Sequence, residues 1–300
     1  MDYLLDKSVI FSFDKSGFER HARGFDKLAI DKQLGRVLIT GGSSGIGKAC
    51  ADFLLGHDNR CIVTGRDAGK FERRRNLESH VLDLSDWPAV IEFVDALEGI
   101  DQLVLNAGGM PDRYRENQAG CEYQCASQLL GHLLLFRCLH DTGKLAKGAK
   151  VIFVSSGGML LKSLNMDTLF QSQNYDKVDQ YANVKRAQVL MNEAYALRFP
   201  EYCFAAMHPG WVATRALQEA LPGFSSRLAS RLRSHHQGAD TILWLLYNTQ
   251  LESGLFWFDR KQANTNPLPW TRNTHADIKE LETSVEAYIN DSLVDSREET

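Results

Sequence analysis

A glycine-rich turn between an apolar stretch and a helical pattern constrains the fold of this chain most. The turn spells Thr40-Gly41-Gly42-Ser43-Ser44-Gly45-Ile46-Gly47; apolar residues precede it at 37–39, and residues 48–55 carry apolar side chains at helical spacing. A strand, a glycine turn and a helix in this order are typical of a dinucleotide site. Gly41 allows a sharp turn, while Gly45 and Gly47 allow a pyrophosphate and the next strand to approach the helix start. An ordinary glycine-rich turn between a strand and a helix is the alternative.

Strand-like and helix-like segments alternate after this turn. We expect further strands at 60–64, 80–82, 103–105, 151–154, 204–207 and 255–258, and helices at 87–97, 119–140, 178–198 and 237–246. This alternation predicts an α/β fold with a single Rossmann-type, doubly wound parallel sheet and helices on both faces. We assign residues 35–260 to that domain, residues 1–34 to an N-terminal extension and residues 261–300 to a C-terminal tail with a helix.

Composition narrows the partners and the compartment. With 44% hydrophobic residues, 24% charged residues and a net charge of −4, the chain is unlike a nucleic-acid-binding protein. No apolar run approaches the ~18 residues of a transmembrane helix, and residues 1–30 lack the pattern of a secretory signal. We therefore expect a cytoplasmic protein with no metal site, whose scattered cysteines are buried thiols: Cys50, Cys61, Cys121, Cys125, Cys138 and Cys203.

The N-terminal extension is too apolar for a free tail. Aromatic and aliphatic residues interleave with charged ones through its first 23 residues. One interpretation is an amphipathic segment that lies on a membrane or a partner; the other is a strap packed across the domain. The segment lacks a sustained basic face, which favours the strap.

One expected helix and three expected strand ends carry residues suited to catalysis. Tyr181 and Lys185 lie four residues apart, on one face of the expected helix at 178–198. A cation about 4 Å from a phenol is worth on the order of 4 kcal/mol at a dielectric of 20, or about three pKa units below the usual ~10. That pair alone is a weak signal. Polar or glycine-rich stretches also end three expected strands, at 106–109, 155–156 and 208–214, and their joint occurrence is a stronger one.

Across residues 35–260 the chain resembles the short-chain dehydrogenase/reductase family of the classical type. Three residues separate Gly41 from Gly45 and one separates Gly45 from Gly47, a spacing that differs from that of the sugar-nucleotide epimerase branch. Stretches typical of one subfamily with vertebrate and bacterial members are Val154-Ser155-Ser156-Gly157-Gly158-Met159-Leu160, His208-Pro209-Gly210-Trp211, Gln237-Gly238-Ala239-Asp240-Thr241 and Asp259-Arg260-Lys261.

The resemblance implies a role for each matching residue. Tyr181 would be the catalytic acid/base, Lys185 would lower its pKa and hold the nicotinamide ribose, and Ser156 would hydrogen-bond the reacting carbonyl oxygen. Residues 211–228 would form a lid over the substrate. The cofactor would contact Gly41, Ser43, Ser44, Gly45, Ile46, Gly47, Asp83, Leu84, Asn106, Ala107, Gly108, Pro209, Gly210, Val212 and Thr214, besides Tyr181 and Lys185.

The end of the second strand bears on the choice of cofactor. NAD-selective relatives place an acid there, whereas this chain has Gly65 followed by Arg66. An arginine fits a 2′-phosphate by charge and by its forked donors. Ser44 stands where many NADP-preferring relatives carry a basic residue, so we expect NADP as the preferred cofactor, with NAD as a second one.

The chain departs from the family in the helix before Ser156. Relatives carry an asparagine there that helps to hold a water linking the catalytic lysine to solvent, and this chain has Gln128 at the matching position. We expect Gln128 to take over that role in catalysis.

These features predict an NAD(P)-dependent oxidoreductase acting on a small-molecule carbonyl or alcohol, on its own or as a homo-oligomer, with neither nucleic acid nor membrane as partner. The alternative is a non-catalytic protein that binds NADP on the same scaffold.

Overall fold

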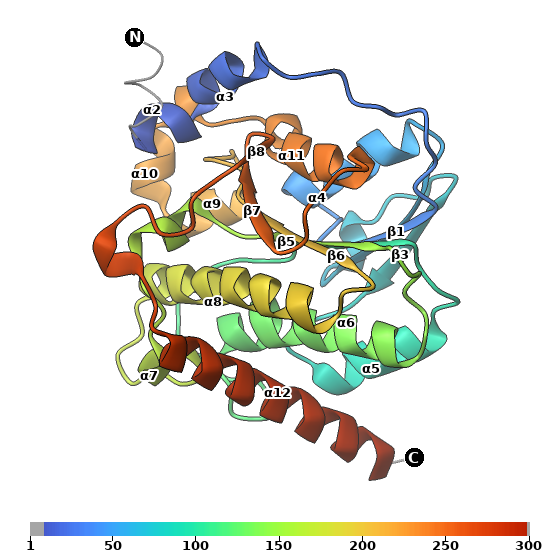
Figure 1. Ribbon diagram of the computed structural model, residues 1–300, viewed down its shortest axis with the longest axis vertical. Helices are drawn as coiled ribbons and strands as arrows, with labels where there is room; N and C mark the ends of the chain where they lie inside the picture. The colour runs from blue at the N-terminus through green and yellow to red at the C-terminus, as the bar shows by residue number, and fades with distance from the viewer. Residues whose placement is uncertain (1–8, 299–300) are drawn as a thin grey trace.

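The computed structural model describes residues 9–298, arranged around one eight-stranded sheet with the order β3-β2-β1-β4-β5-β6-β7-β8 (Figure 1). Strands β1 to β7 run parallel, and the two-residue β8 pairs antiparallel with β7. The expected Rossmann-type fold is therefore confirmed, with one antiparallel edge strand that the sequence did not predict. The strands are β1 (Arg36–Thr40), β2 (Arg60–Gly65), β3 (Leu77–Val81), β4 (Gln102–Leu105), β5 (Lys150–Val154), β6 (Cys203–Met207), β7 (Leu255–Phe258) and β8 (Lys261–Gln262).

The sheet is buried on both faces. In β1, Val37 and Ile39 belong to the core under α4 (Gly45–Leu55) and α11 (His235–Tyr247), whereas Leu38 belongs to the core on the opposite face. Successive strand residues point to opposite faces, so two buried faces require strands that are apolar throughout. This is why the inner strands read as largely apolar runs in the sequence, whereas the edge strand β3 is only partly buried and carries polar residues.

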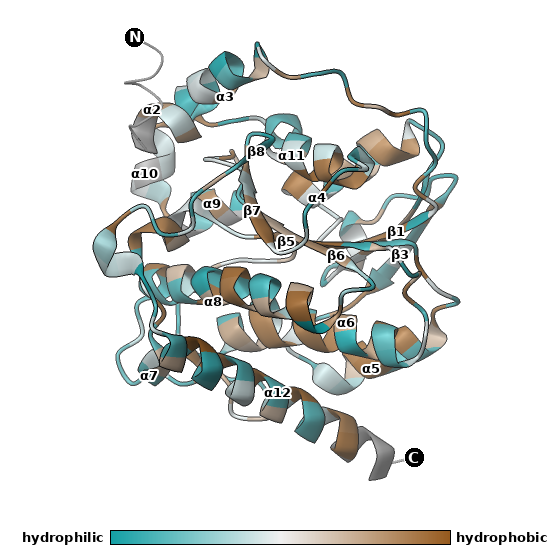
Figure 2. Cartoon of the chain, in the orientation of Figure 1, coloured by the Kyte–Doolittle hydropathy of each residue, from teal (hydrophilic) through white to brown (hydrophobic). Residues whose placement is uncertain are grey.

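The opposite face carries three helices and an outer fourth. Helices α5 (Trp87–Ala96), α6 (Gly131–Asp141) and α8 (Lys177–Arg198) cover the sheet, and α12 (His275–Glu298) lies outside them (Figure 1). The buried residues Leu281, Val285 and Ile289 lie one helical turn apart and join the core of this face. Figure 2 accordingly shows α12 banded with hydrophobic and hydrophilic residues.

Two expected elements differ most in their bounds, while the others agree within two residues at each end. The third strand covers residues 77–81 rather than 80–82. The helix expected over 119–140 starts at Tyr123, continues as a π-helical turn from Cys125 to Leu130 and then becomes α6. Before it, the Asn117 carboxamide oxygen accepts from the N–H groups of Ala119 and Cys121, and this tight turn replaces the first helical turn.

Short helices complete the fold. They are α2 (Val9–Phe13), α3 (Lys15–Ala22), η1 (Ala68–Lys70), η3 (Gly157–Leu161), α7 (Met166–Leu169), α9 (Arg215–Ala220), α10 (Pro222–Arg227), η4 (Ala229–Arg231) and η5 (Pro269–Thr271). Between residues 9 and 298, no helix has the length and apolar character needed to cross a membrane.

Candidate active site

The glycine turn joins β1 to α4 and is held by the end of β4. Asn106 Nδ2 donates to the carbonyl oxygens of Thr40, at 2.9 Å, and Gly41, at 3.3 Å. A methyl group on Gly47 would lie 2.6 Å from Asn106 Nδ2, so only glycine allows α4 to start this close to β4. Gly41 and Gly45 have φ angles of +67° and +58°, which glycine adopts without strain.

The start of α4 fits an anionic group. Ser44, the residue before the helix, makes no side-chain capping hydrogen bond. The N–H groups of the first turn of α4 are therefore able to donate to a ligand. A methyl group on Gly45 would meet only Thr214 Cγ2, at 3.6 Å, which leaves room for a ligand above the turn. The expected contact residues Ser43 and Ile46 lie on the same turn, partly exposed. The residues present therefore fit a dinucleotide pyrophosphate.

Thr40 and His132 connect this turn to the helix layer, and the sequence analysis singled out neither. The Thr40 hydroxyl oxygen accepts from the N–H groups of Asn106, at 2.9 Å, and Ala107, at 3.0 Å, and lies 2.9 Å from His132 Nε2. Burial and the nearby charge of Lys185 lower the pKa of His132 to about 3, so the ring is neutral. Hydrogen bonds thus connect the carboxyl ends of β1 and β4 to each other and to α6.

Lys185 lies on α8, which starts after Asp176 caps the N–H groups of Val178 and Asp179. The lysine side chain is buried, and Nζ donates to the Val154 carbonyl oxygen, at 3.1 Å, at the end of β5. A methyl group on Gly108 would lie 3.4 Å from the same Nζ, so the ammonium also reaches the end of β4. Burial lowers the pKa of Lys185 to about 7.

Tyr181 lies one turn before Lys185, with Lys185 Nζ 5.4 Å from the centre of its ring. Burial raises the pKa of Tyr181 to about 12, and the Ser156 hydroxyl acts in the opposite direction. The expectation that Lys185 lowers the pKa of this phenol is therefore wrong for this structure. The physical reason is that both groups lose solvent, and the lysine loses its own charge near neutral pH.

Ser156 follows β5 by two residues and starts η3. Its hydroxyl oxygen accepts from Gly158 N at 3.3 Å, and it is the Ser156 side chain, rather than that of Ser155, that interacts with Tyr181. The Ser155 hydroxyl is buried and donates to the Lys185 carbonyl oxygen at 3.0 Å. One serine thus faces the site and the other fastens β5 to α8.

Gln128 lies in the π-helical turn beside Lys185. Its Nε2 donates to the Gly109 carbonyl oxygen at 2.7 Å, while its buried Oε1 has no hydrogen-bond partner among residues 9–298. A methyl group on Gly108 would lie 2.8 Å from that Oε1 and 3.4 Å from Lys185 Nζ. Both polar atoms therefore lie close to Gly108.

The other end of the site contains Arg66 and Asp83, joined by Tyr123, a residue that the sequence analysis missed. Arg66 Nη1 donates to the Tyr123 hydroxyl at 2.9 Å, and that hydroxyl donates to Asp83 Oδ2, also at 2.9 Å. Burial alone would raise the pKa of Asp83, but hydrogen bonds from Ser85 and Tyr123 and the charge of Arg66 lower it. Leu84, beside Asp83, is buried in the core.

The end of β6 brings Pro209, Gly210, Val212 and Thr214 to the same edge of the sheet. The Thr214 hydroxyl caps α9 by accepting from Leu217 N at 3.2 Å. A methyl group on Gly238 of α11 would lie 2.7 Å from Val212 Cγ2 and 3.1 Å from Ile46 Cγ1, so this loop packs against the glycine turn. The expected cofactor residues from β1, β4 and β6 are thus neighbours.

Comparisons with known proteins agree with this arrangement. The family model described as "NAD dependent epimerase/dehydratase family" matches residues 37–249. Human dehydrogenase/reductase SDR family member 12 is 35% identical over 289 residues, covering 90% of this chain and 91% of the relative. Human retinol dehydrogenase 14 is 28% identical over 268 residues, covering 77% of this chain and 80% of the relative.

A solved structure supports the fold. The RhlG/NADP active-site complex of Pseudomonas aeruginosa superposes with a TM-score of 0.59 at 19% identity, covering 77% of this chain and 96% of that chain. The resemblance drawn from the sequence is confirmed, including its subfamily. The chain belongs to the short-chain dehydrogenase/reductase family, the superfamily that also contains the epimerases and dehydratases of the matching model.

Proposed function

We propose that this protein is an NADP-preferring oxidoreductase that interconverts a carbonyl and an alcohol. The observation that carries the proposal is the gathering of Ser156, Tyr181 and Lys185 at the end of β5, beside a glycine turn that fits a dinucleotide. The identified relatives support a dehydrogenase or reductase.

A bound nicotinamide would supply or accept the hydride in this reaction. Tyr181, with a pKa of about 12, keeps its proton at neutral pH and donates it to the carbonyl oxygen during reduction. The Ser156 hydroxyl donates a second hydrogen bond to that oxygen as negative charge develops on it. Lys185, with a pKa of about 7, is able to return a proton toward the phenolate at neutral pH.

Gln128 completes this proton path in our proposal. Among residues 9–298 its buried Oε1 has no hydrogen-bond partner, and like Lys185 Nζ it lies beside Gly108. A buried acceptor without a hydrogen bond is costly, so this oxygen is suited to accept from the ammonium through a bridging group such as water. Relative to asparagine, the longer side chain of glutamine keeps the amide while extending it by one methylene.

Substrates with an apolar body fit the proposal best. The segment 211–228 follows the end of β6 beside the glycine turn and contributes Trp211, Leu217, Leu221 and Leu228. Assays of NADPH consumption with aldehydes, ketones and quinones would identify the substrate class. A charged sugar phosphate as best substrate would contradict this part of the proposal.

Tyr181→Phe tests the catalytic assignment. The variant loses one hydroxyl, so it should lose turnover while its affinity for NADPH stays within a few-fold of the wild type. Near-native kcat on a true substrate would overturn the assignment. A wild type that binds NADPH but turns over no carbonyl or alcohol would instead identify a non-catalytic binding protein.

The matching family model makes an epimerase or dehydratase the second candidate. An epimerase returns its hydride to the substrate, so it consumes no cofactor over a complete turnover. Stoichiometric loss of NADPH absorbance with a carbonyl substrate would therefore exclude it as the main activity.

A further inference from the structure

We propose that Phe13 is a positioning residue of the active site: it holds the segments that carry Ser156 and the Pro209-Gly210 turn. Residues 11–21, here called the strap, thereby form one side of the site. This inference rests on the proposed function. It starts from a buried arginine, Arg233, in the loop before α11.

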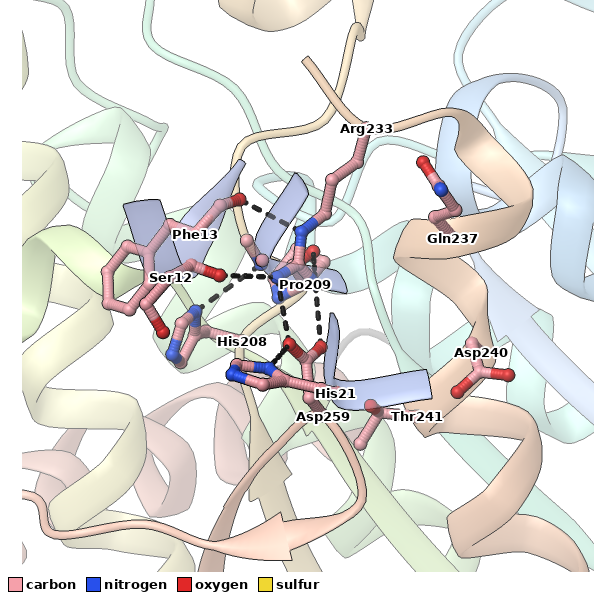
Figure 3. Close-up of polar contacts among 12 residues, drawn as sticks. Ser12, Phe13, His21, His208, Pro209, Arg233, Gln237, Asp240, Thr241 and Asp259 are labelled. Atoms are coloured by element: carbon pink, nitrogen blue, oxygen red, sulfur yellow. Dashed lines mark hydrogen bonds and ion pairs between the residues drawn. The ribbon is translucent and has the colours of Figure 1, made fainter. Parts of the chain in front are cut away.

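Arg233 ties three segments together (Figure 3). Its Nη1 and Nη2 donate to the two carboxylate oxygens of Asp259, at 2.6 and 2.8 Å, in the turn between β7 and β8. The same guanidinium donates to the carbonyl oxygens of Ser12, at 2.9 Å, Phe13, at 2.9 Å, and Pro209, at 3.3 Å. The two charges neutralise each other, and the remaining donors are satisfied, as a buried ion pair requires.

The backbone repeats this connection at the Pro209-Gly210 turn. Trp211 N donates to the Phe13 carbonyl oxygen at 2.8 Å, and Arg233 N donates to the Trp211 carbonyl oxygen at 2.7 Å. Gly210 has a φ of +74°, and a methyl group on it would lie 2.6 Å from the Phe13 carbonyl oxygen. The strap therefore packs directly against the Pro209-Gly210 turn, which the family resemblance expects to contact the cofactor.

The Phe13 side chain reaches both sides of the site. Its ring centre lies 4.5 Å from that of His208, the residue before Pro209, and 5.0 Å from that of Phe258. A methyl group on Gly157, the residue after Ser156, would lie 2.5 Å from Phe13 Cε2. One buried ring thus contacts the segment that carries Ser156 and the segment that carries the Pro209-Gly210 turn.

Further contacts fix the strap in place. His21 Nδ1 lies 2.6 Å from Asp259 Oδ2, and Arg231 Nε donates to Asp14 Oδ2 at 2.8 Å. Beyond the strap, Arg260 donates through Nε to Asp240 Oδ2 and through Nη1 to the Asp26 carbonyl oxygen, at 2.8 and 2.7 Å. The subfamily stretches around positions 208, 240 and 259 thus all contribute contacts that hold the N-terminal extension on the domain.

Phe13→Ala and Phe25→Ala separate positioning from packing. Phe25 belongs to the same N-terminal extension and packs on Phe18 and Arg260. We expect both variants to lower the melting temperature. Only Phe13→Ala should speed hydrogen exchange in peptides 155–161 and 208–213, which needs neither cofactor nor substrate. The proposal would be overturned if both peptides of the Phe13→Ala variant exchanged at the wild-type rate. It would also be overturned if Phe25→Ala accelerated their exchange equally.

Kinetics give the second readout. Phe13→Ala should lose at least about tenfold in kcat while KM for NADPH changes less than threefold, because the misplaced groups act on the reacting atoms. Phe25→Ala should keep kcat within twofold. A loss confined to KM would contradict positioning. If wild type turns over no carbonyl or alcohol, the proposed function fails, and the exchange data alone decide on Phe13.

A second route guards against a Phe13→Ala protein that does not fold. Gly157→Ala places a methyl against the Phe13 ring, and Phe13→Leu removes the ring edge that it meets. We expect the double variant Gly157→Ala/Phe13→Leu to exchange more slowly in peptide 155–161 than Gly157→Ala alone. Purely additive effects of the two changes would overturn the contact as the means of positioning.

Discussion

Lys185, to which the proposed function gives a catalytic role, is shielded from solvent. Its side chain is 1% exposed, and its pKa falls to about 7 from an ordinary 10.5 because burial penalises the ammonium. The proposed reaction uses this lowered pKa, whereas the folded protein has to bear the buried charge. The lysine therefore favours function at the expense of stability.

Lys185→Met should reveal this cost. The folded pKa lies below the unfolded one, so wild-type stability rises as pH increases from 7 toward 10.5, and the variant lacks this rise. We expect the variant to be more stable by roughly 2–4 kcal/mol at pH 6, an advantage that shrinks by about 1 kcal/mol per pH unit between pH 7 and 9. Urea unfolding at pH 6 and pH 9 measures both; a gain that is independent of pH would contradict a buried charge as its source.

Arg66 provides the residue-scale test of cofactor choice. A side chain at Gly65, where NAD-selective relatives place an acid, would lie 2.7 Å from Ser43 Oγ, whereas Arg66 is exposed and next to that position. Arg66→Ala should weaken NADPH binding about ten- to hundredfold, the equivalent of about 1.5–3 kcal/mol, and leave NADH binding unchanged. The exposed Arg73 supplies the control, since Arg73→Ala should alter neither.

Calorimetry with both cofactors decides this prediction. Equal affinity of the wild type for NADPH and NADH would contradict it. So would equal weakening of both cofactors by Arg66→Ala, because that result would reflect the loss of the Tyr123 contact rather than a missing phosphate partner.

At the residue scale, the positions of the polar side chains were easier to predict from the sequence than their pKa shifts. Helical spacing predicts that Tyr181 and Lys185 share a face, because four residues make about one turn. Tyr123 and His132 were missed, since their contacts depend on how helices dock on the sheet. The direction of the Tyr181 shift was wrong for the same reason: burial is a tertiary property that local spacing does not contain.

Among the elements, the π-helical turn at Cys125–Leu130 shapes the site most directly. Gly131 N donates to the Ala126 carbonyl oxygen, five residues back, at the end of the turn. The Gln128 carbonyl oxygen is contacted by His132 Nδ1 at 2.8 Å and accepts from Gln188 Nε2. No periodicity in the sequence distinguishes such a turn from an α-helix, so the alternation of elements was predictable and this irregularity was not.

Gly131, at the end of the turn, packs closely against the backbone at Leu84. A methyl group on this glycine would overlap the Leu84 carbonyl oxygen, and that backbone cannot move aside like a flexible side chain. Gly131→Ala should therefore destabilise the protein by at least about 2 kcal/mol. A methyl group on Gly109 meets nothing within 4 Å, so Gly109→Ala should stay within about 0.5 kcal/mol of wild type. Similar unfolding midpoints for the two variants would contradict this packing argument.

At the scale of the whole molecule, the sequence segments before and after the central domain pack on it and are held there by buried arginines. Arg233 holds the strap, and Arg186, next to Lys185, donates to the carbonyl oxygens of Thr265 and Thr271, both at 2.6 Å. The sequence favoured an N-terminal extension packed on the domain. Arginines usually read as surface residues, however, so the places where the two extensions attach could not be predicted. The helix near the C-terminus was predicted, but its docking site was not.

Glu286 on α12 connects this helix to α6 and α8 through polar contacts. It accepts hydrogen bonds from Arg137 Nη1, at 2.7 Å, and Tyr195 OH, at 2.8 Å, and its Oε1 pairs with Arg198 Nη1 at 2.8 Å. Removing this acid takes a partner from Arg137 on α6 and from Tyr195 and Arg198 on α8. The Arg137 side chain is only 12% exposed and keeps a longer ion pair, of 3.7 Å, with Asp141. A largely buried arginine that loses its 2.7 Å partner destabilises the fold by more than the ion pair contributes.

Glu286→Ala should therefore lower the free energy of unfolding by about 2–4 kcal/mol. Glu280→Ala is the matched control, because Glu280 is exposed on the same helix and should change stability by less than about 0.5 kcal/mol. NADPH affinity should be unchanged in both, since α12 lies on the outside of the helix layer and away from the glycine turn (Figure 1). Equal unfolding free energies for the two variants in urea would show that the apolar residues of α12 hold it without help from this acid.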